Sequence, residues 1–105
     1  MNDAVALELG RRWAQTLGAD VGALVIAVGA TIEERSGGIS PARVLIAESH
    51  PGTRRIVLFS DAMAYVAETD GGDVRSLALA HECFHLLEGG GESAAHAFAR
   101  GFLGL

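Results

Sequence analysis

Two histidines stand at a spacing that suits a metal site. His81 and His85 belong to the stretch HECFH, with Glu82 between them, and the stretch lies within a run of helix-forming residues. Because an α-helix turns once in about 3.6 residues, the two histidines project from one face and their imidazoles can share one ion. Neutral imidazole nitrogens are ligands that suit zinc. The spacing therefore predicts a Zn2+ site on this helix.

Glu82 is predicted to take part in the chemistry without binding the metal. It follows His81 directly, so its side chain lies about 100° further around the helix. From there it can accept a proton from a zinc-bound water, whose pKa the metal lowers to about 7. The carboxylate then passes that proton to the leaving amine of a peptide bond. The motif thus predicts zinc-dependent hydrolysis of peptide bonds with Glu82 as the general base.

A hydrolytic zinc site also needs a third protein ligand and one open position. The candidates downstream of the motif are Glu88, Glu92 and His96. Glu88 lies on the same helix as His85, but a ligand further along that axis reaches away from the site. Glu92 is favoured, because it begins the next helix after a glycine turn and can close a tetrahedron that one helix cannot. His96 lies one helical turn beyond Glu92 and remains an alternative.

The sequence around these residues resembles the zincin metallopeptidases, and among them the small gluzincins, which include the minigluzincins and the ImmA/IrrE-type peptidase family. One basis is the HExxH motif, and the other is the segment ESAAHAFARGFL at 92–103. That segment resembles the family signature E-x-x-A-x-x-F-A, whose leading Glu is the third zinc ligand, which implies this role for Glu92. The chain departs from the family at His96, where Asp or Asn is usual, and in its short LLEGGG connection, which is closer to other small bacterial zincins.

The resemblance also implies a class of substrate. The minimal gluzincin core binds an extended segment of its substrate antiparallel to an edge strand of the sheet. We therefore expect a protein or peptide substrate, with RRIVLF at 54–59 as the edge strand. Two alternatives remain open: a zincin-like protein-binding module that holds zinc with little or no turnover, and a metal-free interaction domain.

The elements before the motif are predicted from hydrophobic spacing. Apolar residues four apart predict an amphipathic helix over residues 3–18, with Asp3 as its cap. The continuous apolar run GALVIAV at 22–28 predicts a buried strand. The polar segment at 29–43 contains glycines and a proline and is predicted to be a loop.

A β-hairpin is predicted next. The segments RVLIAES and RRIVLF flank HPGT, whose Pro51-Gly52 pair suits a tight turn. Ser60 or Asp61 is then the predicted cap of a short helix or turn. The pattern gives the sheet three strands when the apolar run at 22–28 is included.

Two helices complete the expected fold. Asp73 is the predicted cap of the helix that contains HECFH, glycines 89–91 end that helix, and a final helix begins at Glu92. The order predicts an α+β fold: a minimal zincin-like domain with an N-terminal helix, a sheet of three or more strands with a hairpin, an active-site helix and a C-terminal helix. The 105 residues suit one domain over 1–105.

Composition narrows the classes of partner and compartment. The net charge of −5 argues against nucleic-acid binding, for which a basic surface is usual. A single cysteine, Cys83, excludes an intrachain disulfide and suits a reducing compartment. The N-terminus has no basic segment followed by an apolar run, and the longest apolar run is too short to cross a bilayer. We therefore expect a cytoplasmic protein without membrane contact.

Overall fold

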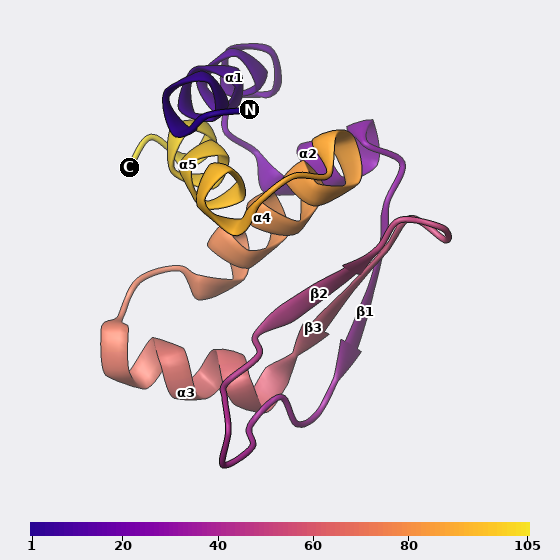
Figure 1. Ribbon diagram of the computed structural model, residues 1–105, viewed down its shortest axis with the longest axis vertical. Coiled ribbons are helices and arrows are strands. Elements are labelled where there is room, and N and C mark those ends of the chain that lie inside the picture. The colour runs from indigo at the N-terminus through magenta and orange to yellow at the C-terminus, as the bar shows by residue number, and fades with distance from the viewer.

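The structure is a computed structural model that describes residues 1–105. Five helices and a three-stranded mixed sheet form an α+β fold, which confirms the predicted class. In Figure 1, α1 and α5 lie side by side at one end, α4 crosses the middle, and the sheet lies beyond α4. The elements in chain order are α1 (Asp3–Leu17), α2 (Val21–Ala27), β1 (Thr31–Arg35), β2 (Ala47–His50), β3 (Arg55–Phe59), α3 (Ser60–Asp70), α4 (Val74–Glu88) and α5 (Glu92–Leu103).

The first and last helices approach each other so closely that side chains are excluded between them. A Cβ atom on Gly10 of α1 would lie 2.2 Å from the carbonyl oxygen of Phe98. A Cβ atom on Gly101 of α5 would lie 2.1 Å from the carbonyl oxygen of Leu7. Only glycine fits at these two positions, so α5 is held firmly against α1. The position of Glu92, the first residue of α5, is thereby set by this helix pair.

The strand order in the sheet is β1–β3–β2. β1 runs parallel to the central strand β3, and β2 runs antiparallel to it. Ile56 and Leu58 of β3 are fully buried in the core that includes α4. Their partners on β2 are Ser49 and Ala47, which therefore share this face of the sheet. β2 is an edge strand on the side of the sheet that packs against α4.

The strand order corrects the prediction for RRIVLF. This segment forms β3, which is paired on both sides and has no free edge for a substrate. The prediction failed because the parallel partner β1 lies within 29–43, which the sequence pattern suggests is a loop. The edge strand that faces the motif helix is β2 instead.

Residues 22–28 are a second correction, because most of this run forms helix α2 rather than a strand. Asp20 caps the helix by accepting a hydrogen bond from the backbone N–H of Ala23 at 3.2 Å. Leu24 and Val25 are buried in the core. A short apolar run that is buried as a helix has the same composition as a buried strand, so the pattern alone does not separate them.

The other helices and the hairpin are confirmed, although the N-cap residue of α3 is Phe59 rather than Ser60 or Asp61. Asn2, rather than Asp3, caps α1 by accepting a hydrogen bond from the backbone N–H of Val5. Asp73 caps α4 as predicted, through the backbone N–H of Ser76. None of the helices combines the length and the apolar character that are needed to cross a membrane.

Candidate metal centre

Helix α4 presents the two histidines of the motif on one face while the core holds its other faces. The Nε2 atoms of His81 and His85 are 3.2 Å apart, and their rings meet edge to face. Packing against the core fixes the helix and therefore the imidazoles on it. The residues of α4 that are buried are Val74, Ala78, Leu79, Ala80, Glu82, Cys83, Phe84 and Leu86.

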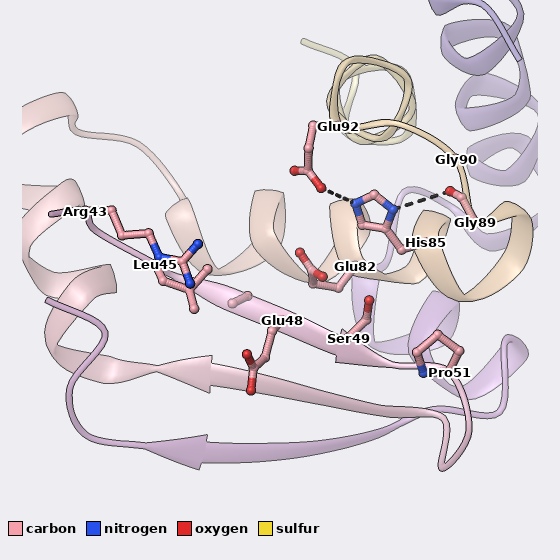
Figure 2. A pocket seen from close by; sticks show the side chains of 11 residues that line it. Arg43, Leu45, Glu48, Ser49, Pro51, Glu82, His85, Gly89, Gly90 and Glu92 are labelled. Atoms are coloured by element: carbon pink, nitrogen blue, oxygen red, sulfur yellow. Dashed lines mark hydrogen bonds and ion pairs between the residues drawn. The ribbon is translucent and has the colours of Figure 1, made fainter. Parts of the chain in front are cut away.

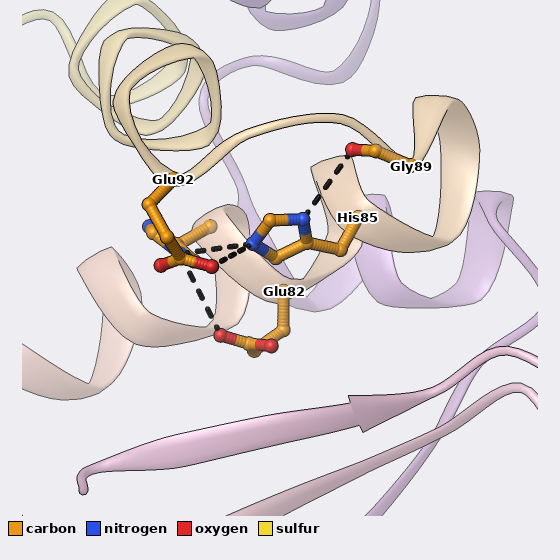
Figure 3. A network of polar contacts seen from close by, with 5 residues as sticks. Glu82, His85, Gly89 and Glu92 are labelled. Carbon is orange, nitrogen blue, oxygen red and sulfur yellow. Dashed lines mark hydrogen bonds and ion pairs between the residues drawn. The ribbon is translucent and has the colours of Figure 1, made fainter.

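A glycine turn brings Glu92 back toward these histidines. Gly89 has φ +66° and ψ −129°, a backbone conformation that residues with a side chain rarely adopt. Helix α5 then begins at Glu92, whose carboxylate oxygens each lie 2.9 Å from an imidazole, Oε2 from His81 Nε2 and Oε1 from His85 Nε2. Figure 3 shows the Glu92 side chain extending from the start of α5 to His85.

Glu92 is directed at the histidines rather than at its own helix. A glutamate in the first turn of a helix often does no more than complement the helix dipole. Here the side chain makes no capping hydrogen bond at the start of α5. Partial burial opposes its ionisation, but the attraction of His81 and His85 outweighs this and lowers the pKa of Glu92. The carboxylate is therefore anionic at neutral pH, which is the form that binds a metal.

The spacing of the three side chains fits a metal ion. Zinc ligands lie about 2.0–2.2 Å from the ion, so two ligands of a tetrahedral site are about 3.3 Å apart. Here Glu92 Oε2 is 2.9 Å from His81 Nε2, Glu92 Oε1 is 2.9 Å from His85 Nε2, and the two Nε2 atoms are 3.2 Å apart. His81, His85 and Glu92 therefore form a group that could hold an ion, named here the His–His–Glu cluster. Imidazole and carboxylate also serve other first-row metals, so these donors do not select zinc alone.

The orientation of His85 suits metal binding. Its Nδ1 atom lies 3.3 Å from the carbonyl oxygen of Gly89. Because a carbonyl only accepts, a neutral His85 ring that makes this hydrogen bond carries its proton on Nδ1 and leaves the Nε2 lone pair free for a metal. Lone pairs of His85 and Glu92 then face the same point, an arrangement that a cation stabilises. A hydrogen bond to the second ring nitrogen is also how proteins orient histidine ligands.

Glu82 lies beside the His–His–Glu cluster without belonging to it. Its side chain is buried, and its Oε2 atom is 3.8 Å from His81 Nε2. Burial raises the pKa of the Glu82 carboxyl, and His81, His85 and the Ser49 hydroxyl of β2 partly offset this. Figure 3 shows Glu82 between the cluster and the edge strand. The Glu82 side chain is thus placed where it could exchange protons with a water molecule beside an ion in the cluster.

A groove of about 720 Å³ runs between β2 and the His–His–Glu cluster (Figure 2). A second, more apolar cavity of about 360 Å³ adjoins it and shares Leu45, Ala47, Glu82 and Glu92 as lining residues. The larger space, of about 720 Å³, is the one that we name the groove. Its lining consists of Arg43, Leu45, Ala47, Glu48, Ser49, Pro51, Glu82, His85, Gly89, Gly90 and Glu92.

The alternative ligands lie outside the cluster. Glu88 is exposed on α4, and His96 is exposed on α5, where it lines the apolar cavity. His50 is half-buried, and its Nε2 atom lies 3.0 Å from Glu48 Oε1. Cys83 is a buried thiol, and burial raises its pKa to about 12.

Two residues of the groove were not identified from the sequence. Ser49 approaches Glu82 from β2, and Arg43 lines the groove just before β2. The only signal in the sequence is the alternation of side chains in the predicted strand 43–49, which puts Ala47 and Ser49 on one face. Their proximity to the cluster depends on the sheet packing against α4, which local patterns do not report.

Together these residues provide the parts that metal-assisted hydrolysis requires. Three donor atoms converge, a buried carboxylate lies 3.8 Å from one of them, and an open groove passes beside both. Comparisons of the chain with protein-family models, with curated proteins and with solved structures found no match.

Proposed function

We propose that the protein is a zinc-dependent metallopeptidase of the small gluzincin type. His81, His85 and Glu92 would bind the metal, and Glu82 would be the general base. The observation that supports this most directly is the convergence of His81, His85 and Glu92, whose donor atoms all lie within 4.8 Å of one another, beside a buried carboxylate. A bound zinc ion supplies Lewis acidity and makes hydroxide available at neutral pH.

Glu82 is the residue that would move the proton. Its carboxylate borders the groove and lies between the cluster and Ser49, so a water molecule and the amide of a substrate can both reach it. Burial to 7% exposure keeps the side chain in one orientation while the proton is held. The proton accepted from water is then released to the amine of the cleaved bond.

The substrate class follows from the edge strand beside the groove. The backbone of β2, Ala47–His50, pairs with β3 on one side only. An extended segment can add to such a free edge through main-chain hydrogen bonds, which are independent of side-chain identity. We therefore propose a protein or peptide substrate that lies along β2. We also keep the cytoplasm as the proposed compartment, because the single cysteine is a free thiol.

Zinc content tests the ligands. The wild-type protein should purify or reconstitute with about one zinc per chain, and a His81→Ala, His85→Ala variant with almost none, since each histidine supplies one donor atom. His96→Ala is the matched control, because His96 is exposed and lies outside the cluster. Elemental analysis measures the ratio, and equal zinc in all three proteins would overturn the proposed site.

Turnover tests Glu82. A Glu82→Gln variant should keep its zinc and lose at least about 10²-fold in the rate of cleavage of a flexible protein such as casein, because the amide cannot accept the proton. Glu88→Gln on the exposed side of the same helix should cleave at the wild-type rate. Zinc binding without any cleavage by the wild-type protein would instead favour the protein-binding module, an alternative consistent with the 81% exposure of the Glu92 side chain.

A further inference from the structure

Arg43 lies at the end of the groove where the chain enters β2. Figure 2 shows its guanidinium group beside Leu45, at the opposite end of the groove from Pro51. The side chain makes no ion pair within the protein, whereas four other arginines each pair with a glutamate. An unpaired guanidinium in a ligand-sized groove is available to bind a group from outside the chain.

The backbone that presents Arg43 is held in one conformation by the loop at 36–46. The N–H of Ser40 donates to the carbonyl of Arg43 at 3.0 Å, and the N–H of Arg43 donates to the Ser40 hydroxyl at 3.2 Å. The N–H of Leu45 donates to the carbonyl of Gly38 at 2.7 Å. A Cβ atom on Gly38 would lie 2.4 Å from the carbonyl oxygen of Leu45, so the loop closes tightly there. Arg43 is therefore presented from a fixed backbone.

The charges along the groove make Arg43 distinct. It is the only lysine or arginine among the lining residues, which also include Glu48, Glu82 and Glu92. Without a bound metal, these carboxylates repel an anionic group along the rest of the groove. A guanidinium binds a carboxylate through two parallel charge-assisted hydrogen bonds, which fixes both position and orientation. The favourable position for a carboxylate is thus the Arg43 end.

The direction of β2 determines which end of a peptide reaches Arg43. The strand runs from Ala47 to His50, away from Arg43, so a peptide paired antiparallel to it runs toward Arg43 with its C-terminal end. Extended backbone advances about 3.3 Å per residue, so the four residues from Ala47 back to Arg43 span about 13 Å. A parallel peptide would direct its N-terminal ammonium at the guanidinium, which repels it.

We propose that Arg43 binds a carboxylate of the substrate within about four residues on the C-terminal side of the bond at the cluster. The carboxylate is either the free C-terminus of a peptide or the side chain of Asp or Glu. This proposal rests on the proposed function, whose substrate class it narrows to C-terminal or acidic segments. Arg43 is in this view a specificity residue that does not touch the reacting atoms.

Peptide binding to the Glu82→Gln protein tests the proposal without cleavage. The probes are three mixtures of N-acetylated octapeptides with varied internal residues: one with a free C-terminal carboxylate, one with a C-terminal amide, and one amidated with Glu as the third residue from the end. At least one carboxylate mixture should bind about 10-fold more tightly than the plain amide, since a charge-assisted hydrogen bond contributes that much. Which carboxylate mixture binds better identifies the source of the carboxylate.

Arg43 variants in the same background assign the preference to this residue. Arg43→Ala should bind all three mixtures with equal affinity, and Arg43→Lys should keep part of the preference because a charge remains. Arg12→Ala, which removes an exposed arginine on α1, should retain the full preference. A preference that persists in Arg43→Ala, or equal binding of the three mixtures by the protein that retains Arg43, would overturn the proposal.

The same measurements separate this proposal from the proposed function. The carboxylate preference is the ratio of the affinities of two peptide mixtures for the same protein. It can therefore be measured both with zinc and after chelation. A carboxylate preference that depends on Arg43 but is present in a protein that binds no zinc supports the specificity residue and contradicts the metallopeptidase. Zinc-dependent cleavage with no preference supports the metallopeptidase and overturns the role of Arg43.

Discussion

The two sides of the groove are built in different ways. The α4 side is part of the core: Phe84 is fully buried, and its ring centroid lies 5.4 Å from that of Phe98 on α5. The β2 side consists of a short edge strand and the loop at 36–46, where Ile39 and Val44 are 51% and 41% exposed. Backbone hydrogen bonds hold that loop in place, and among its side chains Ile46 packs against the core.

This difference matches what each side would have to do. Metal ligands and a proton acceptor require positions that are accurate to a fraction of an ångström, which a packed helix provides. On a surface that contacts varied substrates, side chains can be substituted without loss of the fold. The α4 side should therefore be sensitive to substitution in stability, and the β2 side mainly in ligand preference.

The largest effect should come from the core beneath the histidines. Phe84→Ala removes a fully buried ring and should lower the free energy of unfolding by about 3–5 kcal/mol. Val44→Ala on the β2 side should cost less than about 1 kcal/mol, because Val44 is already 41% exposed. Urea unfolding followed by circular dichroism measures both, and similar losses would contradict the contrast between the two sides.

The same contrast explains what could be predicted from the sequence. On the α4 side the information is local: a cap at Asp73, two histidines four apart, a glycine turn and Glu92 are adjacent in the chain. Helical geometry and short turns convert these spacings into positions with few alternatives. The helices α4 and α5 and the proximity of Glu92 to His81 were therefore predictable.

The β2 side depends on contacts between distant residues. β1 pairs in parallel with β3 across 24 residues, as Thr31 with Arg55, and this pairing moves β3 from the edge to the centre. No local pattern specifies which strands become neighbours, so the edge strand was assigned wrongly. The placement of Ser49 and Arg43 in the groove depends on the same packing, because the groove forms only when the sheet lies against α4.

Metal binding should increase the difference in stability between the α4 side and the β2 side of the groove. The reason is that the His–His–Glu cluster connects α4 to α5. Zinc at about 100 times its dissociation constant should stabilise the protein by about 2.7 kcal/mol. In Glu92→Gln the zinc-dependent gain should fall, whereas stability without metal should hardly change because the side chain is 81% exposed.

Thermal unfolding in zinc and in chelator measures this gain. The exposed Glu88→Gln on α4 serves as the control and should behave like the wild-type protein. An unchanged zinc effect in Glu92→Gln would mean that the third donor lies elsewhere. No zinc effect in any of the three proteins would favour a metal-free domain.

The smallest effect concerns the cap of α4, where Asp73 accepts hydrogen bonds from the N–H and the hydroxyl of Ser76 at 3.0 and 2.6 Å. Asp73→Ala should cost about 1 kcal/mol at pH 7. Hydrogen bonds from Ser76 hold the pKa of Asp73 below its ordinary value of 3.8, so its contribution is complete above that value and is lost as the pH falls through the lowered pKa. The difference in free energy of unfolding between the wild-type protein and Asp73→Ala should narrow in acid, as urea unfolding at pH 7 and pH 3 would show.

The control is Asp73→Asn, which keeps a capping side chain that does not titrate. A pH-dependent difference in stability between Asp73→Asn and Asp73→Ala would contradict this assignment.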